Sequence, residues 1–95
     1  MFTVFIVEDD PFYGRLLQHH LGAEGDYTVE LFTTAASCLE ELYRKPDVIS
    51  IDYGLPDMDG NELFDRIREK NSATAIIVTS GQEDVDTAVN LLKRG

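Results

Sequence analysis

Three carboxylates follow two apolar runs of this sequence, at the point where each run ends. The run Phe2–Val7 stops at Glu8 and Asp9, and the run Val48–Ile51 stops at Asp52. A buried acid beside an apolar strand is costly unless something compensates for its charge. If the two runs are adjacent parallel strands, their carboxyl ends bring the three acids into one pocket, where they repel one another. A divalent cation relieves that repulsion, and ligands that are all oxygen favour Mg²⁺.

Composition and charge argue against several classes of protein. The chain of 95 residues predicts a single domain, residues 1–95, and its 43% apolar and 27% charged residues are ordinary for a globular protein. The net charge of −10 argues against direct contact with nucleic acid and against an anionic membrane surface as partner. Cys38 is the only cysteine, so we expect a buried apolar residue rather than a disulfide, and a cytoplasmic setting.

The elements that must position the acids alternate between strands and helices. Hydrophobic patterning predicts strands at about 2–7, 27–32, 47–51 and 75–79, and helices at about 11–21, 35–44, 61–70 and 84–94. This alternation is typical of an α/β fold with a doubly wound parallel sheet.

The polarity of the strands predicts their order in the sheet. The strand at 27–32 alternates polar and apolar residues, which favours an edge, so we expect the order 2-1-3-4. The winding direction then reverses between the first and third strands. Ligands of such sheets bind at this switch point, beyond the carboxyl ends of the strands, which is where the acids lie.

Several further polar residues have structural interpretations. Asp10 is expected to cap the first helix, whose inner face is predicted to include Phe12, Leu16, Leu17 and Leu21. Asp57 and Asp59 are expected to form turns and to cap the third helix. His19 and His20 are adjacent on a helix and point in different directions, which favours a surface position over a metal pair or a relay.

Three motifs, taken in order, resemble the receiver domain of bacterial two-component response regulators. They are Phe5–Asp10, then Val48–Asp52 with Leu55–Gly60, and finally Ile77–Gly81. The resemblance covers the whole chain in order and spacing. It implies a flavodoxin-like receiver fold, in which a sensor histidine kinase donates a phosphoryl group to an aspartate with the help of Mg²⁺.

The resemblance also implies how the cation is held. Asp9 matches the acid that binds Mg²⁺ directly, and Glu8 matches its neighbour, which usually holds the ion through water. Gly54 matches the position whose backbone carbonyl completes the protein ligands. Asp52, the matching phosphoacceptor, shares the same ion.

Two further roles concern the phosphoryl group itself. Thr79 matches the hydroxyl residue that bonds a phosphoryl oxygen, and Ser80 matches a small residue that leaves room for phosphoryl and water. A phosphoryl group adds about −1.5 to −2 charge, enough to bias a loop and a helix between two arrangements. Gly81–Asp84 and the helix after it are the expected movers, because they follow Thr79.

One departure from the family concerns the end of the sequence. The family normally has a fifth strand and helix, and that strand ends in a lysine that pairs with the phosphoryl group. Here the fifth βα unit is absent after Gly95, so we expect a piece of a longer protein. The strand at 75–79 then becomes an edge with unpaired backbone groups. A homodimer, with exchanged elements, is the expected way to cover that edge.

Two other classes of function stay open at this stage. A Mg²⁺-dependent phosphohydrolase with an aspartyl nucleophile would use similar chemistry, but its acids typically lie close together on one strand end. A flavodoxin-like mononucleotide binder would need a phosphate loop rich in Gly, Ser and Thr after the first strand. The acids Glu8, Asp9 and Asp10 have the wrong charge for that loop.

Overall fold

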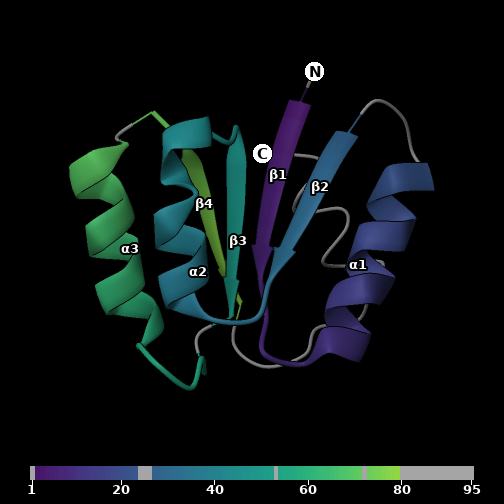
Figure 1. Cartoon of the computed structure of the whole chain (residues 1–95), viewed down its shortest axis with the longest axis horizontal. Coiled ribbons are helices and arrows are strands. Elements are labelled where there is room, and N and C mark those ends of the chain that lie inside the picture. Colours follow the sequence, from purple (N-terminus) through teal and green to yellow (C-terminus); the bar gives the residue numbers. More distant parts are fainter. Residues whose placement is uncertain (1, 24–26, 53, 72, 80–95) are drawn as a thin grey trace.

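Four parallel strands form one sheet in the part of the chain that the structure describes, in the order β2-β1-β3-β4 (Figure 1). The computed structural model describes residues 2–23, 27–52, 54–71 and 73–79. The strands are β1 (Phe2–Val7), β2 (Tyr27–Phe32), β3 (Val48–Asp52) and β4 (Ala75–Thr79). The helices are α1 (Pro11–Ala23), α2 (Ala35–Glu40), the 3₁₀ helix η1 (Leu42–Arg44) and α3 (Gly60–Lys70). The parallel α/β fold and its strand order are confirmed, and the helix predicted at 84–94 lies outside the described residues.

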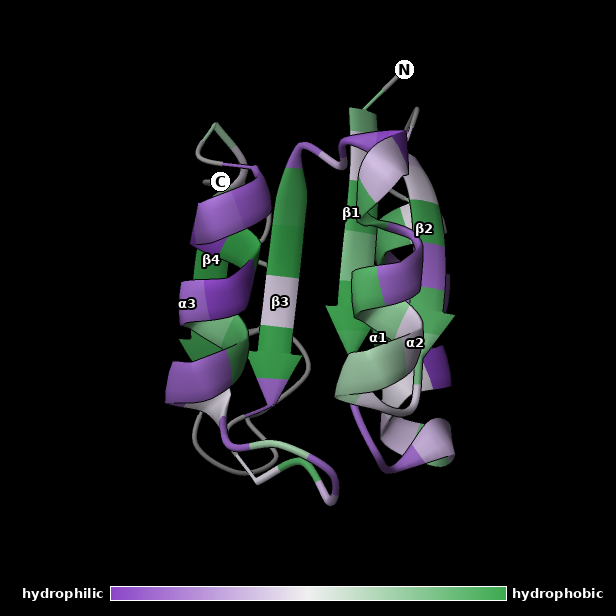
Figure 2. Ribbon diagram, turned by 60° about the vertical axis from the view of Figure 1, so that its left-hand side comes forward, coloured by the Kyte–Doolittle hydropathy of each residue, from purple (hydrophilic) through white to green (hydrophobic). Residues whose placement is uncertain are grey.

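Helices cover both faces of the central strands, so β1 and β3 are apolar on both sides. Phe5 and Val7 of β1 pack in a cluster with α2 and α3, whereas Val4 and Ile6 pack in a second cluster with α1. Every residue of β3 is buried. In Figure 2 both strands are largely green, and the outward face of α3 is largely purple. Burial on both faces is what a central parallel strand requires.

The strand β2 lies at one edge of the sheet, as its alternating sequence predicts. All six of its residues are only partly buried. It pairs with β1 in parallel from Phe2↔Tyr27 to Val7↔Phe32. On the other side of β1, the pairing with β3 ends at Val7↔Ile51. The strands β1 and β3 therefore end at the same level, at the switch point of the sheet.

The inner face of α1 differs from the prediction by one position. Phe12 is 67% exposed, so the prediction that it packs inward was wrong. Leu17 and Leu21 are buried, as predicted, and so are Tyr13 and Gly14. Tyr13 rather than Phe12 shares a side of the helix with Leu17 and Leu21, because the three are spaced four residues apart. The close approach of this side to β2 depends on Gly14, because a Cβ there would lie 2.5 Å from a methyl group of Leu31.

The segment between α2 and β3 also differs from the prediction. The predicted helix at about 35–44 divides into α2 and η1, and Lys45 ends the second part in the left-handed region, with φ of 52°. Cys38 on α2 is buried, as expected, and burial raises the pKa of its thiol to about 12. A thiol of such high pKa is a poor nucleophile. Within the described residues, no helix has both the length and the apolar character needed to cross a membrane.

Candidate functional site

Three carboxylates meet at the switch point of the sheet. Glu8 and Asp9 directly follow β1, and Asp52 is the last residue of the adjacent strand β3. Each of the three offers a carboxylate oxygen, and these three atoms all lie within 4.8 Å of one another. Glu8 is 3% and Asp52 8% exposed, whereas Asp9 faces solvent. The structure therefore brings together the three acids that the sequence singles out.

Backbone N–H groups hold the two buried carboxylates in place. The N–H of Gly54 donates to Oδ1 of Asp52 at 3.2 Å, and the N–H of Asp10 donates to Oε2 of Glu8 at 3.1 Å. The N–H of Glu8 itself donates to the carbonyl of Phe32 at 2.9 Å, which extends the pairing of β1 with β2 by one residue. Each acid is thus fixed by the turn that follows its strand.

Burial makes the ionised forms of these acids unfavourable. It raises the pKa of the Glu8 carboxyl from 4.5 to about 8; the N–H of Asp10 opposes the increase, and the charge of Asp52 adds to it. Burial also raises the pKa of Asp52, against the lowering effect of the N–H of Gly54. Without a cation, the cluster therefore retains a proton near neutral pH.

The cluster fits a small hard cation. Its donors are all carboxylate oxygens, the donor type that Mg²⁺ and Ca²⁺ prefer. Burial raises the pKa of Glu8 and Asp52, which means that their ionised forms are unfavourable in the folded protein. A bound cation would offset this cost of ionisation. The N–H of Gly54 lies against Asp52, which places this residue beside the cluster as well.

The other residues predicted for this site are placed only in part. Thr79 of β4 is the register partner of Asp52 in the β3–β4 pairing, so its backbone lies beside the phosphoacceptor candidate. Ser80 lies outside the described residues, as does the predicted moving segment after it.

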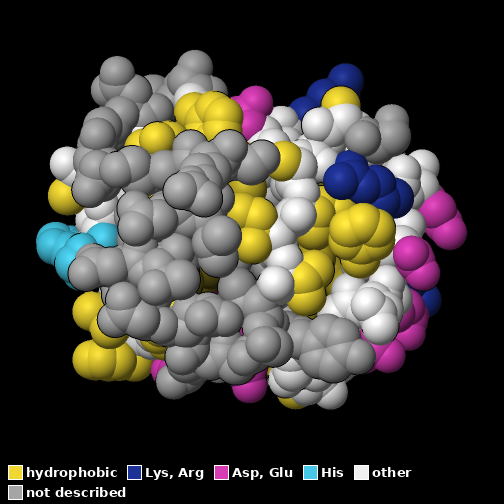
Figure 3. Space-filling view, turned by 180° about the vertical axis from the view of Figure 1, so that it is seen from behind, with side chains coloured by type: hydrophobic (Ala, Val, Ile, Leu, Met, Phe, Trp, Pro, Cys, Tyr) yellow, Lys and Arg dark blue, Asp and Glu magenta, His cyan; other side chains and the backbone are white. Residues whose placement is uncertain are grey.

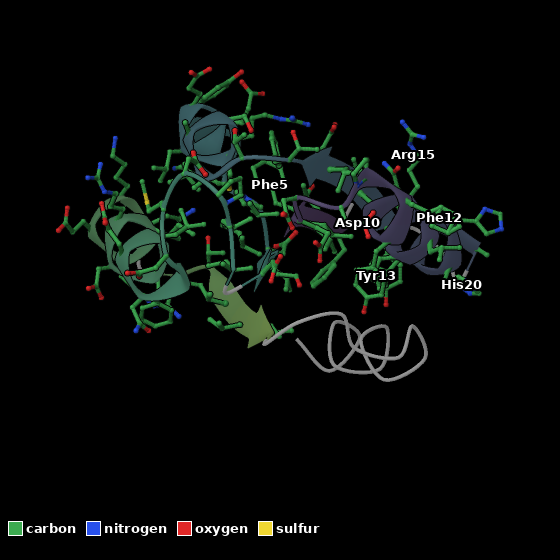
Figure 4. The ribbon with its side chains drawn as sticks, turned by 90° about the horizontal axis from the view of Figure 1, so that it is seen from below. Phe5, Asp10, Phe12, Tyr13, Arg15 and His20 are labelled. Carbon is green, nitrogen blue, oxygen red and sulfur yellow. The ribbon has the colours of Figure 1, made fainter. Side chains whose placement is uncertain are left out.

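Other acids near the cluster accept hydrogen bonds from the first N–H groups of helices. Asp10 accepts hydrogen bonds from Phe12 and Tyr13 at the beginning of α1, as predicted, and Figure 4 shows Phe12 and Tyr13 beside it at the end of the sheet. Asp59 accepts from Glu62 at the beginning of α3, also as predicted.

The prediction that Asp57 helps to cap α3 was wrong. Its Oδ1 and Oδ2 accept hydrogen bonds from the N–H groups of Ala35 and Ala36, each at 3.0 Å, at the beginning of α2. These two donors lower the pKa of Asp57. Sequence reasoning missed the contact because the partners lie 22 and 21 residues away and no local pattern reports such a pair.

The histidine pair lies away from this site. His19 and His20 are both exposed on α1, and the histidine side chains form a small patch at the edge of the surface in Figure 3. Their rings are 5.8 Å apart at a nearly perpendicular angle. The predicted surface position is confirmed.

Comparison with known proteins gives the family. A family model for the response regulator receiver domain matches residues 4–95. The chain belongs to the response regulator receiver domain family. This confirms the resemblance that the three ordered motifs indicate.

The receiver domain is similar to parts of several larger regulators. It is 36% identical over 86 residues to the KDP operon transcriptional regulatory protein KdpE of Escherichia coli (strain K12), covering 90% of this chain and 38% of that protein. It is 32% identical over 93 residues to the DNA-binding transcriptional regulator NtrC of the same strain, covering 97% of this chain and 20% of that protein. The chain thus spans less than two-fifths of the length of these two relatives.

Solved structures agree with the family assignment. A CheY-like response regulator receiver domain from Methanospirillum hungatei JF-1 is 27% identical, with a TM-score of 0.80 over 100% of this chain and 76% of that one. A sensor protein from Polaromonas sp. JS666 is 25% identical, with a TM-score of 0.81 over 98% of this chain and 94% of that one. The sheet described above is therefore the receiver fold.

Millimolar Mg²⁺ is expected to raise the melting temperature, because the folded carboxylate cluster binds the ion and the unfolded chain does not. At tenfold excess over the dissociation constant, the gain is about 1.4 kcal/mol, or about 6–11 °C for a domain of this size. Thermal unfolding followed by circular dichroism, with and without Mg²⁺, measures it. Asp9→Asn should weaken the shift and Glu69→Gln, at an exposed site on α3, should keep it. An unchanged wild-type melting curve would contradict the site.

A second prediction concerns pH in metal-free buffer. Between about 4.5 and 8, folded Glu8 retains a proton that the unfolded chain has lost, so its contribution to the free energy of unfolding falls as pH rises. Glu8→Gln lacks this titration. Its stability relative to wild type should therefore increase with pH across that window and stay constant below it. Denaturant unfolding at several pH values tests this, and parallel pH curves for the two proteins would refute it.

Proposed function

We propose that this receiver domain accepts a phosphoryl group on Asp52 from a sensor histidine kinase, with Mg²⁺ as the required cation. The observation that carries the proposal is the meeting of Asp52 with Glu8 and Asp9 within 4.8 Å, at the ligand-binding end of a receiver fold. Glu8, Asp9, Asp52 and the backbone carbonyl of Gly54 would hold the ion. The similar proteins KdpE and NtrC are transcriptional regulators, which agrees with a signalling role.

The proposed chemistry is a transfer between two side chains. A carboxylate oxygen of Asp52 forms a bond to phosphorus while the bond from phosphorus to the kinase histidine breaks, and the electron pair of that bond returns to the imidazole nitrogen. When held by these residues, Mg²⁺ would supply positive charge that offsets the repulsion between the negatively charged reactants. The N–H of Gly54 holds Asp52 in a fixed orientation for the attack.

Two neighbouring residues complete the proposed site. The hydroxyl of Thr79 would donate to a phosphoryl oxygen, which its place opposite Asp52 in the strand register supports. Ser80 would leave space for the phosphoryl group and for the water that later hydrolyses it. The added charge of about −1.5 to −2 would shift residues 81–84 and the segment after them.

The partners follow from the same proposal. The kinase is the phosphoryl donor, and the exchange would take place in the cytoplasm, where the DNA targets of transcriptional regulators lie. Any contact with DNA would come from other parts of the whole protein, because this domain carries a net charge of −10.

A homodimer through the β4 edge stays a prediction. The 44% exposure of the apolar side chain of Val78 on this strand supports it. Gel filtration of a dilute sample would test it, and elution as a monomer would count against it.

The phosphohydrolase alternative is less well supported by the geometry. The proposed nucleophile Asp52 ends β3, whereas the other acids of the cluster follow β1, so they do not share one strand end. Receiver domains of response regulators are signalling domains, even where the whole protein is an enzyme, as the name of a protein-glutamate methylesterase relative indicates. We therefore propose single acceptance of a phosphoryl group rather than turnover.

Acetyl phosphate with Mg²⁺ tests this function directly. Wild-type protein should gain one phosphoryl group by intact mass, and hydroxylamine should remove it, as expected of an acyl phosphate. Asp52→Asn should abolish the adduct, because the amide lacks the nucleophilic oxygen.

The matched control is Asp65→Asn, which makes the same change at an exposed position of α3 and should leave the adduct unchanged. Labelling that persists in Asp52→Asn would contradict the assignment of the acceptor. Continued release of phosphate from many substrates, without a stoichiometric adduct, would favour the phosphohydrolase.

A further inference from the structure

Asp57 connects the segment that leads from β3 to α3 with the beginning of α2. Its two oxygens accept hydrogen bonds from Ala35 and Ala36, each at 3.0 Å. Asp57 belongs to the segment 54–59 that leads from β3 to α3, whereas the alanines begin α2, which follows β2. The carboxylate is exposed at the rim of this end of the molecule, so the contact is not a product of core packing.

Both joined segments also hold acids of the cluster. Segment 54–59 begins at Gly54, whose N–H donates to Asp52. The segment before α2 begins at Phe32, whose carbonyl accepts the N–H of Glu8 at 2.9 Å. A closed ring of contacts therefore runs from Glu8 through Phe32 to α2, across Asp57, and back through Gly54 to Asp52. The direct pairing of β1 with β3 forms the other half of this ring.

Segment 54–59 is held to the rest of the domain by contacts of three residues, of which Asp57 is one. Leu55 is buried in the core cluster below the segment, and Asp59 caps α3 by accepting from Glu62 at 2.9 Å. The apolar cluster that buries Leu55 also contains Ala35 and Cys38 of α2, whereas the hydrogen bond of Asp59 stays at the beginning of α3. Only Asp57, among the described hydrogen bonds of segment 54–59, connects it to the side of the pocket that holds Glu8.

We infer that Asp57 is a positioning residue of the cation site: by tying segment 54–59 to α2, it fixes Gly54, and through Gly54 the carboxylate of Asp52. The inference rests on the proposed function, since it concerns the affinity of the same site for Mg²⁺. A metal site depends on the contacts that orient its ligands, and loss of such an outer contact typically weakens binding about tenfold or more. Asp57 does not touch the reacting atoms.

The test compares two variants that remove caps from the same helix. Asp57→Ala removes the two hydrogen bonds between segment 54–59 and α2. Thr34→Ala removes the other cap of α2, in which the Thr34 hydroxyl accepts from Ser37 at 3.2 Å, and leaves segment 54–59 untouched. Both lose a helix cap, so both should melt at a lower temperature than wild type. Only Asp57→Ala should weaken Mg²⁺ binding.

Isothermal titration with Mg²⁺, well below both melting temperatures, measures the difference. We expect the dissociation constant to rise about tenfold in Asp57→Ala and to stay unchanged in Thr34→Ala. At a fixed Mg²⁺ concentration, acetyl phosphate should label Asp57→Ala more slowly than Thr34→Ala. Equal dissociation constants for the two variants would overturn the positioning role while leaving the proposed function intact. Absence of Mg²⁺ binding by wild type, or labelling that survives Asp52→Asn, would overturn the proposed function and this inference with it.

Discussion

The mutual repulsion of buried carboxylates is the constraint on which the rest of this structure depends. Glu8 and Asp52 lose most of their contact with water where two apolar strands end, and burial raises the pKa of both. A fold gains nothing in stability from such an arrangement by itself. In the proposed function, a cation would relieve this penalty on entering the pocket, and a phosphoryl group would then bind through the cation. The site is thus prepared for ligands by an unfavourable charge distribution.

The fold supplies this arrangement through the placement of β1 and β3. Because both are central and parallel, helices cover both of their faces, and their carboxyl ends meet at the switch point. Short turns then fix the acids: the N–H groups of Asp10 and Gly54 each hold one buried carboxylate. The contact of Asp57 with α2 adds a connection around the outside of the pocket. Stability and function are therefore built from different parts, since the apolar clusters hold the sheet and the turns hold the charges.

Much of this could be predicted from sequence because the relevant signals are local. Apolar runs predict the strands, the acids that end them predict the pocket, and the alternation in β2 predicts the edge, which together give the strand order. The error at Phe12 arose because two adjacent aromatic residues lie at the beginning of α1, and only Tyr13 shares a side of the helix with Leu17 and Leu21. The role of Asp57 could not be predicted, because its partners are distant in sequence and adjacent only after the sheet has formed.

The central claim is that one cation is shared by acids from two strands, and paramagnetic relaxation measures this most directly. In an NMR titration with Mn²⁺ in place of Mg²⁺, the amide signals of Glu8, Asp9 and Gly54 should broaden first. Those of Asp65 and Glu69, exposed acids on α3, should remain sharp. Broadening that spreads evenly over the acidic surface, or that affects the end of β1 and spares Gly54, would contradict a single shared site.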